Sequence, residues 1–321
     1  MSDFVLYSYQ CNPIHVEVDP NTNILPEYFE EQNKKADANM LRHQDYVQEL
    51  FDTEEEIPNL KKGDTMYFLH NGNYYGCKIV MNQGNIIMLR LQKTRYHEYE
   101  LDFKIVTQQE QPSSMVIIDN RHEQQRILIE RNANTFTPKT IATILEKNIG
   151  SWLKQKYSLG FRVPLVFRKS EFWSVVQDHP NGIKKLVFDF PYPNMARPMD
   201  KLGASLKKFG VDIRGKVRVV TQAQKKDFLL IEPQERNEDL DEIVSYLSEV
   251  GAPVNIYLVS GSKVKCYSKD NPILVNINDK IAEFRGKKEN ELFPNQFLEE
   301  VTERLNELKL INYGIPSEGL A

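Results

Sequence analysis

The first third of the chain alternates short apolar runs with turn residues, which is typical of antiparallel strands. MYFLH and YYGCKIV flank Asn71-Gly72-Asn73, and an Asn-Gly pair between two strand-like runs predicts a tight hairpin. MVIID and RILIE, separated by NRHEQQ, predict a second hairpin, and FVLYSY and NIIMLRLQ add further strands. Residues 26–57 carry an acidic, amphipathic helical pattern that ends in a charged loop at Glu54-Glu55-Glu56.

A helix with clear end signals follows. Thr137 is placed to cap it, Pro138 occupies its first position, and apolar residues then recur near helical spacing until Gly160. Lys154 and Lys156 lie in its second half beside Trp152 and Tyr157. The aromatic residues are expected to pack on the core while the lysines stay solvated.

Strand-like and helical patterns alternate after residue 161. The predicted strands are FRVPLVF, IKKLVFDF, KVRVVT, DFLLI, VNIYLVS, KVKCYS and ILVNI. The predicted helices are MDKLGASLKKFG, NEDLDEIVSYLSEVG and residues 295–311. Asn237 is placed to cap the second of these helices and Gly251 to end it.

Together these patterns predict an α+β (mixed α/β) protein. A β-rich domain with an acidic helical insertion is expected at 1–160. An α/β domain with hairpins and a terminal helix, carrying much of the basic surface, is expected at 161–321. A boundary near 158–160 is preferred to one near 110–114, because the hairpin at 115–130 leads directly into the helix at 138.

Composition and motifs limit the classes of protein to which the chain can belong. The N-terminus lacks the pattern of a secretory signal, and no apolar run approaches the roughly 18 to 20 residues of a membrane span, so a cytoplasmic protein is expected. Cys11, Cys77 and Cys266 lie far apart in the sequence, which predicts buried free thiols. The chain has no HExxH, GxxxxGK[ST], GxGxxG or GxSxG motif, so no cofactor and no metal site are predicted.

Two polar clusters are interpreted as turns. The first contains Asp119, Arg121, His122, Glu123 and Arg126 in the second hairpin, where a carboxylate and a histidine could meet a phosphate or a metal. Turns are polar for backbone reasons alone, so no catalytic residue is assigned there. The second cluster, Asp178-His179-Pro180-Asn181-Gly182, has the Pro and Gly of a β-turn.

Charge is distributed unevenly along the 321 residues, whose net charge is −4. Residues 1–146 carry 14 Lys+Arg and 22 Asp+Glu, residues 147–226 carry 17 and 5, and residues 227–321 carry 10 and 18. A basic block with a net charge of +12 therefore lies between two blocks of −8. Its most concentrated stretch is KKFGVDIRGKVRVV at 207–220.

The basic block predicts a surface for nucleic-acid phosphates, because each neutralised phosphate releases counterions and adds sequence-independent affinity. Lys216 and Arg218 share one face of a predicted strand, and Lys201 and Lys208 lie near one another around the preceding helix, with Lys207 close by. The candidate contacts are Lys154, Lys156, Arg168, Lys169, Lys201, Lys207, Lys208, Arg214, Lys216, Arg218, Lys225 and Lys226. The alternative is that these cations pair with the acidic segments on either side.

The order of elements resembles the layout of RexA-type phage-exclusion proteins. The similar segments run from FVLYSY and MYFLHNGNYYGCKIV through SMVIIDNRHEQQRILIE, TFTPKTIATILEKNIGSWL, FRVPLVFR, IKKLVFDFPYP and DKLGASLKKFGVDI to SKVKCYSKDNPILVNIND. The resemblance implies a cytoplasmic, DNA-binding homodimer in abortive infection, an antiviral defence, with a membrane-protein companion. It transfers no functional residue, and the acidic N-terminal third departs from what a DNA surface requires.

The sequence therefore predicts a non-enzymatic protein that binds double-stranded DNA without sequence preference in phage defence. RNA remains open as a ligand. One alternative is a metal-dependent nuclease, or another phosphate-handling enzyme, that uses Asp119 and Glu123. Another is an interaction module in which the basic block binds an acidic partner.

Overall fold

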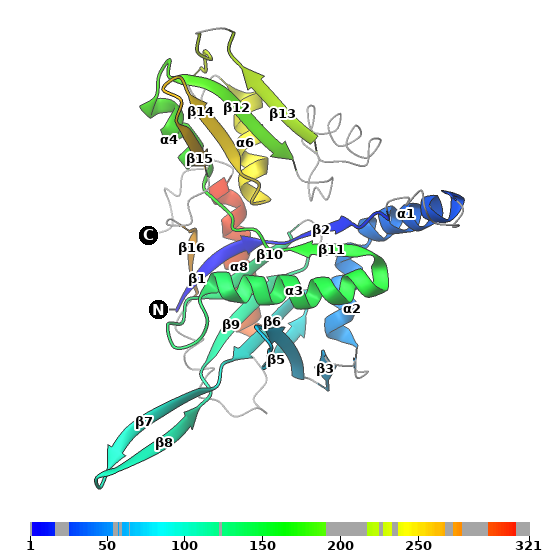
Figure 1. Ribbon diagram of the computed structural model, residues 1–321, viewed down its shortest axis with the longest axis vertical. Coiled ribbons are helices and arrows are strands. Elements are labelled where there is room, and N and C mark those ends of the chain that lie inside the picture. The colour runs from blue at the N-terminus through cyan, green and yellow to red at the C-terminus, as the bar shows by residue number, and fades with distance from the viewer. Residues whose placement is uncertain are drawn as a thin grey trace. The chain divides into compact units, whose positions relative to one another are not determined.

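The computed structural model describes most of the chain in several stretches. These are residues 2–16, 26–53, 57, 60–63, 65–121, 124–190, 217–224, 227–232, 237–266, 272–277 and 295–312. The fold is the predicted α+β mixture, with mostly antiparallel sheets (Figure 1). The predicted helix MDKLGASLKKFG and the loop at Glu54-Glu55-Glu56 lie outside the described residues.

The chain divides into two compact units. Unit 1 contains Met1–Val5 and Tyr9–Val163, and unit 2 contains Leu6–Ser8 and Pro164–Ala321. The division into domains at 1–160 and 161–321 stays a prediction.

A large antiparallel sheet forms the centre of unit 1. Its strands follow the order β1-β10-β9-β6-β5-β4-β3. Their bounds are β1 Ser2–Ser8, β3 Lys61–Lys62, β4 Thr65–His70, β5 Asn73–Gln83, β6 Ile86–Gln92, β9 Ser113–Asp119 and β10 Arg126–Glu130. Of β1, the part that belongs to unit 1 ends at Val5. Every residue of β9 and β10 is buried, so the middle of this sheet is covered on both faces.

The Asn71-Gly72 hairpin is confirmed. Asn71 has φ 49° and Gly72 has φ 79°, and β4 and β5 pair directly on either side of them. Two residues with positive φ match the right-handed twist of the strands that they join.

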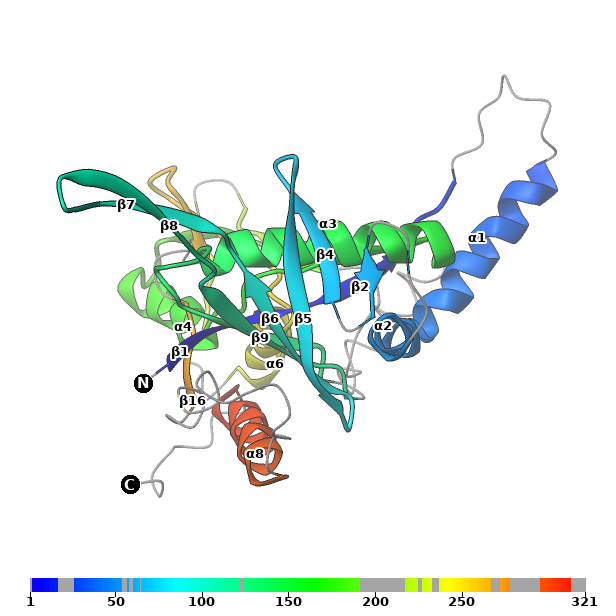
Figure 2. The same ribbon diagram turned by 90° about the horizontal axis from the view of Figure 1, so that it is seen from below.

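Helix α3 (Pro138–Tyr157) lies across the strands of unit 1 (Figure 2). The Thr137 side chain accepts a hydrogen bond from the Thr140 amide, as predicted for an N-cap. The helix ends before Gly160, because Ser158 takes the left-handed conformation with φ 56°. Six buried residues attach it to the core: Ile141, Ala142, Ile144, Leu145, Ile149 and Leu153.

Unit 1 contains further elements at its periphery. The acidic segment forms α1 (Pro26–Leu41) and α2 (His43–Asp52), as its pattern predicts. Strand β2 (Gln10–Pro13) pairs with β11 (Leu159–Arg162). Strands β7 (Arg95–Leu101) and β8 (Lys104–Glu110) form a separate two-stranded hairpin that the sequence pattern did not predict.

A four-stranded antiparallel sheet forms the centre of unit 2, in the order β13-β12-β14-β15 (Figure 1). The bounds are β12 Ile183–Phe190, β13 Val217–Gln222, β14 Val254–Leu258 and β15 Lys263–Cys266. A further strand, β16 (Leu274–Ile277), follows Ile273, whose carbonyl accepts a hydrogen bond from the Leu6 amide at 3.0 Å.

Two helices, α4 (Lys169–Asp178) and α6 (Glu238–Glu249), pack on one face of this sheet. Phe172 and Leu247 from the helices meet Phe188, Val254 and Ile256 from the strands in one buried cluster. Each such side chain contributes about 1.5 to 3 kcal/mol when it leaves water. The predicted terminal helix is α8 (Asn295–Asn312), which buries Val301 and Leu305.

Some local predictions for unit 2 are wrong. DFLLI does not form a strand; Leu229 donates one hydrogen bond to the Ile183 carbonyl, and Leu229 and Ile231 pack against the core. The Asn237 side chain makes no capping hydrogen bond, although its carbonyl accepts from the Asp241 amide. Gly251 does end α6, with φ 67°.

All three cysteines are buried free thiols, as predicted. Burial raises the pKa of the Cys11 and Cys77 thiols well above the usual range and the pKa of Cys266 to about 12. Among the described residues, no helix is long and apolar enough to cross a membrane.

We expect the native thiols to resist alkylation. A pKa of about 12 leaves about one Cys266 thiol in ten thousand ionised at pH 8, and the thiolate is the reactive form. Mass spectrometry after maleimide treatment should find no label in native protein and three labels after unfolding in denaturant. Rapid native labelling of one cysteine would contradict its burial.

Gly251→Ala should destabilise unit 2. A Cβ there would lie 2.7 Å from the Leu165 carbonyl oxygen and 2.8 Å from Pro164 Cβ, and φ is positive. Strain and crowding should together lower the free energy of unfolding by about 3 kcal/mol in urea titrations. Gly261→Ala is the control, because φ is also positive but nothing lies within 4 Å of the added carbon. An equal loss in both variants would show that crowding contributes nothing.

Candidate nucleic-acid interface

Five of the twelve predicted phosphate contacts are described. Lys154 and Lys156 belong to unit 1, whereas Arg168, Lys169 and Arg218 belong to unit 2. The other seven lie outside the described residues: Lys201, Lys207, Lys208, Arg214, Lys216, Lys225 and Lys226.

Lys156 is part of a polar and aromatic cluster that joins α3 to α2. Its ammonium group and the Tyr157 hydroxyl both donate to the Glu49 carboxylate. The Tyr157 ring stacks on Tyr46, with 3.7 Å between ring centroids, and Lys156 Nζ lies 5.3 Å from the centroid of Trp152. The Lys156 side chain nevertheless stays 51% exposed and Lys154 is exposed, so the predicted solvation of both lysines is confirmed.

This cluster shifts the pKa values of Glu49, Lys156 and Tyr157. Burial alone would raise the pKa of Glu49, but hydrogen bonds from Lys156 and Tyr157 outweigh it and leave that pKa below its usual value. The hydrogen bond to Glu49 raises the pKa of Lys156. Lys156 is thus held as a cation that already has a carboxylate partner.

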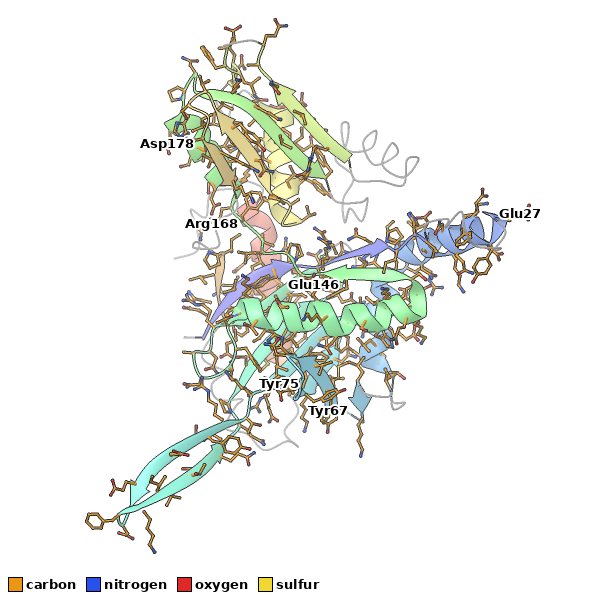
Figure 3. All side chains as sticks on the ribbon, viewed as in Figure 1. Glu27, Tyr67, Tyr75, Glu146, Arg168 and Asp178 are labelled. Carbon is orange, nitrogen blue, oxygen red and sulfur yellow. The ribbon has the colours of Figure 1, made fainter. Side chains whose placement is uncertain are left out.

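Arg168 and Lys169 begin α4, which ends at Asp178 (Figure 3). Arg168 is exposed and occupies the N-cap position. Lys169 Nζ lies 2.9 Å from Asp241 Oδ2 in α6, and Trp173 Nε1 donates to Asp241 Oδ1 at 2.8 Å. The Lys169 side chain is only 13% exposed, so this cation connects two helices rather than facing solvent.

Arg218 lies on β13, directly opposite Asp189 on β12. Its guanidinium donates to the Asp189 carboxylate, and this hydrogen bond raises the pKa of Arg218. The Arg218 side chain nevertheless stays 65% exposed. Lys156, Lys169 and Arg218 thus all have carboxylate partners, and two of these partners, Glu49 and Asp241, come from the flanking acidic segments. For Lys156 and Lys169 the structure thus contains the pairing with acidic segments that the alternative interpretation predicts.

The sheet of unit 2 carries a different basic surface on the side that faces away from α4 and α6. Leu186, Phe188, Val254, Ile256 and Val264 point toward α4 and α6, so the residues that alternate with them point the other way. We call this opposite side the Tyr257 face. Its strand positions are Lys185, Val187, Asp189, Arg218, Val220, Gln222, Asn255, Tyr257, Lys263 and Lys265.

Four of these residues are cations and one is an acid. Lys263 and Lys265 are exposed, and Lys185 and Tyr257 are half-buried. Lys185, Tyr257 and Lys263 form one cross-strand row. Lys185 Nζ and Lys263 Nζ each lie 5.2 Å from the centroid of the Tyr257 ring. The row therefore places an aromatic ring between two positive charges.

Sequence reasoning missed the three lysines of this face. Lys263 and Lys265 lie in the acidic C-terminal block, and Lys185 gains its significance only through partners on β14 and β15. Strict alternation in KVKC was the signal available, since it places both lysines on one side of a strand.

In the turn after β9, Asp119 and Arg121 form an ion pair. The Asp119 carboxylate is fully buried, and Arg121 Nε and Nη2 each donate to it at 2.8 Å. His122 and Glu123 lie outside the described residues. In the described part of the chain, no three His, Cys, Asp or Glu side chains are grouped to hold a metal ion.

The second polar cluster is a turn, as predicted. His179 follows α4, Asn181 has φ 60°, and the Gly182 amide donates to the His179 carbonyl at 3.0 Å. This turn borders a cavity of about 430 Å³, whose lining includes Trp173 and Val176.

A scan against family models, a search of curated proteins and a search of solved structures find no match to this chain. The resemblance to RexA-type proteins therefore stays an expectation that rests on the order of elements.

Asp241→Ala should destabilise unit 2 by about 1 to 3 kcal/mol, because the Lys169 ammonium and the Trp173 indole would both lose their acceptor. Urea unfolding followed by circular dichroism measures this loss. Asp239→Ala is the matched control, since it removes an exposed acid from the same first turn of α6. Equal effects would mean that helix-end electrostatics, not the buried contacts, account for the loss.

Proposed function

We propose that this chain is a non-enzymatic, cytoplasmic protein that binds DNA without sequence preference, and that the Tyr257 face of unit 2 is its binding surface. The observation that supports this proposal is the convergence of Lys185, Lys263, Lys265 and Arg218 on one side of one sheet. Asp189 is the one carboxylate among the described strand positions of that side.

The chemistry of this face favours phosphate over base edges as the main contact. Lysine is a flexible point charge with no fixed donor geometry, so it attracts phosphates without reading sequence. Counterion release adds affinity for each phosphate contacted, and this term does not require the whole protein to be basic. Double-stranded DNA is the proposed ligand for such contacts.

The biological setting is proposed from the resemblance alone. It would be phage exclusion by abortive infection, with a homodimer and a membrane-protein companion. A nuclease receives no support from Asp119, whose buried carboxylate is already bound by Arg121.

Lys263→Glu combined with Lys265→Glu should weaken duplex binding for every sequence alike. Each lost phosphate contact makes the slope of log K against log salt shallower by about 0.9, so the double variant should change it by about 2. Fluorescence anisotropy with two unrelated duplexes, from about 50 to 200 mM salt, measures this slope.

The matched control is Lys104→Glu combined with Lys139→Glu. Both lysines are exposed in unit 1, and the change in net charge is the same. Equal weakening by both pairs would indicate a general charge effect and remove the Tyr257 face as the binding site. Absence of duplex binding by the unaltered protein at about 50 mM salt would overturn the proposed function.

A further inference from the structure

The cross-strand row of Lys185, Tyr257 and Lys263, which we call the Tyr257 row, contains an aromatic ring. Attraction of phosphates alone does not require such a ring. Tyr257 presents a half-buried aromatic ring at the middle of the row, between Lys185 on β12 and Lys263 on β15. Duplex DNA keeps its bases stacked on one another, so it offers phosphates to such a row and no base face to the ring. A ligand that matches all three side chains has both a flat aromatic group and negative charges close to it.

We infer that the Tyr257 face binds single-stranded nucleic acid, with one base stacked on Tyr257 and the neighbouring phosphates on Lys185 and Lys263. This inference rests on the proposed function, in which a duplex uses the phosphate contacts alone, and adds single-stranded nucleic acid as a ligand of the same face. An unpaired base exposes the π face that a tyrosine ring can stack against, and such stacking tolerates any base.

The geometry of the row allows a base to replace one lysine ammonium group on the Tyr257 ring. Both ammonium groups lie 5.2 Å from the ring centroid, where each makes a cation–π contact with the ring. A base that stacks on the ring displaces one ammonium group, and the flexible lysine stem lets that group follow to the adjacent phosphate. The exposed Lys265 and Arg218 extend the positive charge along the same face for further phosphates.

The neighbouring side chains on this face suit a base rather than a second protein. Val187 and Asn255 lie next to the Tyr257 row on this face and are buried. Val220, which pairs with Val187, is 47% exposed. Asp189 is already bonded to Arg218. The apolar contact area near Tyr257 is therefore small and surrounded by cations, whereas stable protein interfaces need large buried areas with few charges at their core.

The test compares three probes on the full-length protein at about 50 mM salt. They are an oligothymidylate of about 20 nucleotides, an abasic deoxyribose-phosphate strand of the same length, and a duplex of that length. The abasic strand keeps the phosphates and removes the bases. The unaltered protein should bind oligothymidylate about 5- to 150-fold more tightly than the abasic strand, which corresponds to stacking of one base.

Tyr257→Leu should abolish this preference and leave duplex affinity unchanged, while Tyr257→Phe should keep it, because the ring is retained. Equal binding of oligothymidylate and abasic strand by the unaltered protein would overturn the inference, even if Tyr257→Leu does not fold. Unchanged preference in a folded Tyr257→Leu variant would also overturn it. In either case, duplex binding that still depends on Lys263 and Lys265 would leave the proposed function intact, whereas failure to bind any probe would overturn both.

Discussion

The two-residue alternation of side chains in β12, β14 and β15 is the constraint on which the candidate interface depends. Burial of Phe188, Val254 and Ile256 against α4 and α6 fixes which side of the sheet is the core. Every intervening residue must then point the other way, and a shift of one residue in register would exchange the two sides. The core therefore determines that Lys185, Tyr257 and Lys263 share a surface, although no direct attraction between lysines could bring them together.

Among the described residues, ion pairing distinguishes Lys156 and Lys169 from Lys263 and Lys265. Lys156 and Lys169 are held by carboxylates from α2 and α6, and in both cases an aromatic hydroxyl or indole donates to the same carboxylate. Each carboxylate thereby joins two elements of its unit. Lys263 and Lys265 project from the last strand of the unit 2 sheet and are exposed. Net charge along the sequence cannot distinguish these groups, because it counts a cation without its partner.

The sequence predicted most of the elements because their end signals are local. Asn71-Gly72 specified a hairpin through two positive φ angles, and Thr137-Pro138 specified the start of α3. The hairpin of β7 and β8 was missed since its turn places Phe103 at φ 59°, a conformation that phenylalanine rarely adopts. The prediction of a strand at DFLLI was wrong because a short apolar run packs equally well on a core without pairing with another strand.

The candidate site was harder to predict than the fold, for a physical reason. A helix cap involves residues within one turn, whereas the Tyr257 row joins three strands whose pairing depends on the whole core of unit 2. The alternation in KVRVVT placed Arg218 correctly on a strand, yet its carboxylate partner, Asp189, comes from another strand of the same sheet. A surface that binds a polymer of phosphates needs several cations at suitable spacing on one side. Cross-strand register, rather than local charge density, provides that spacing here.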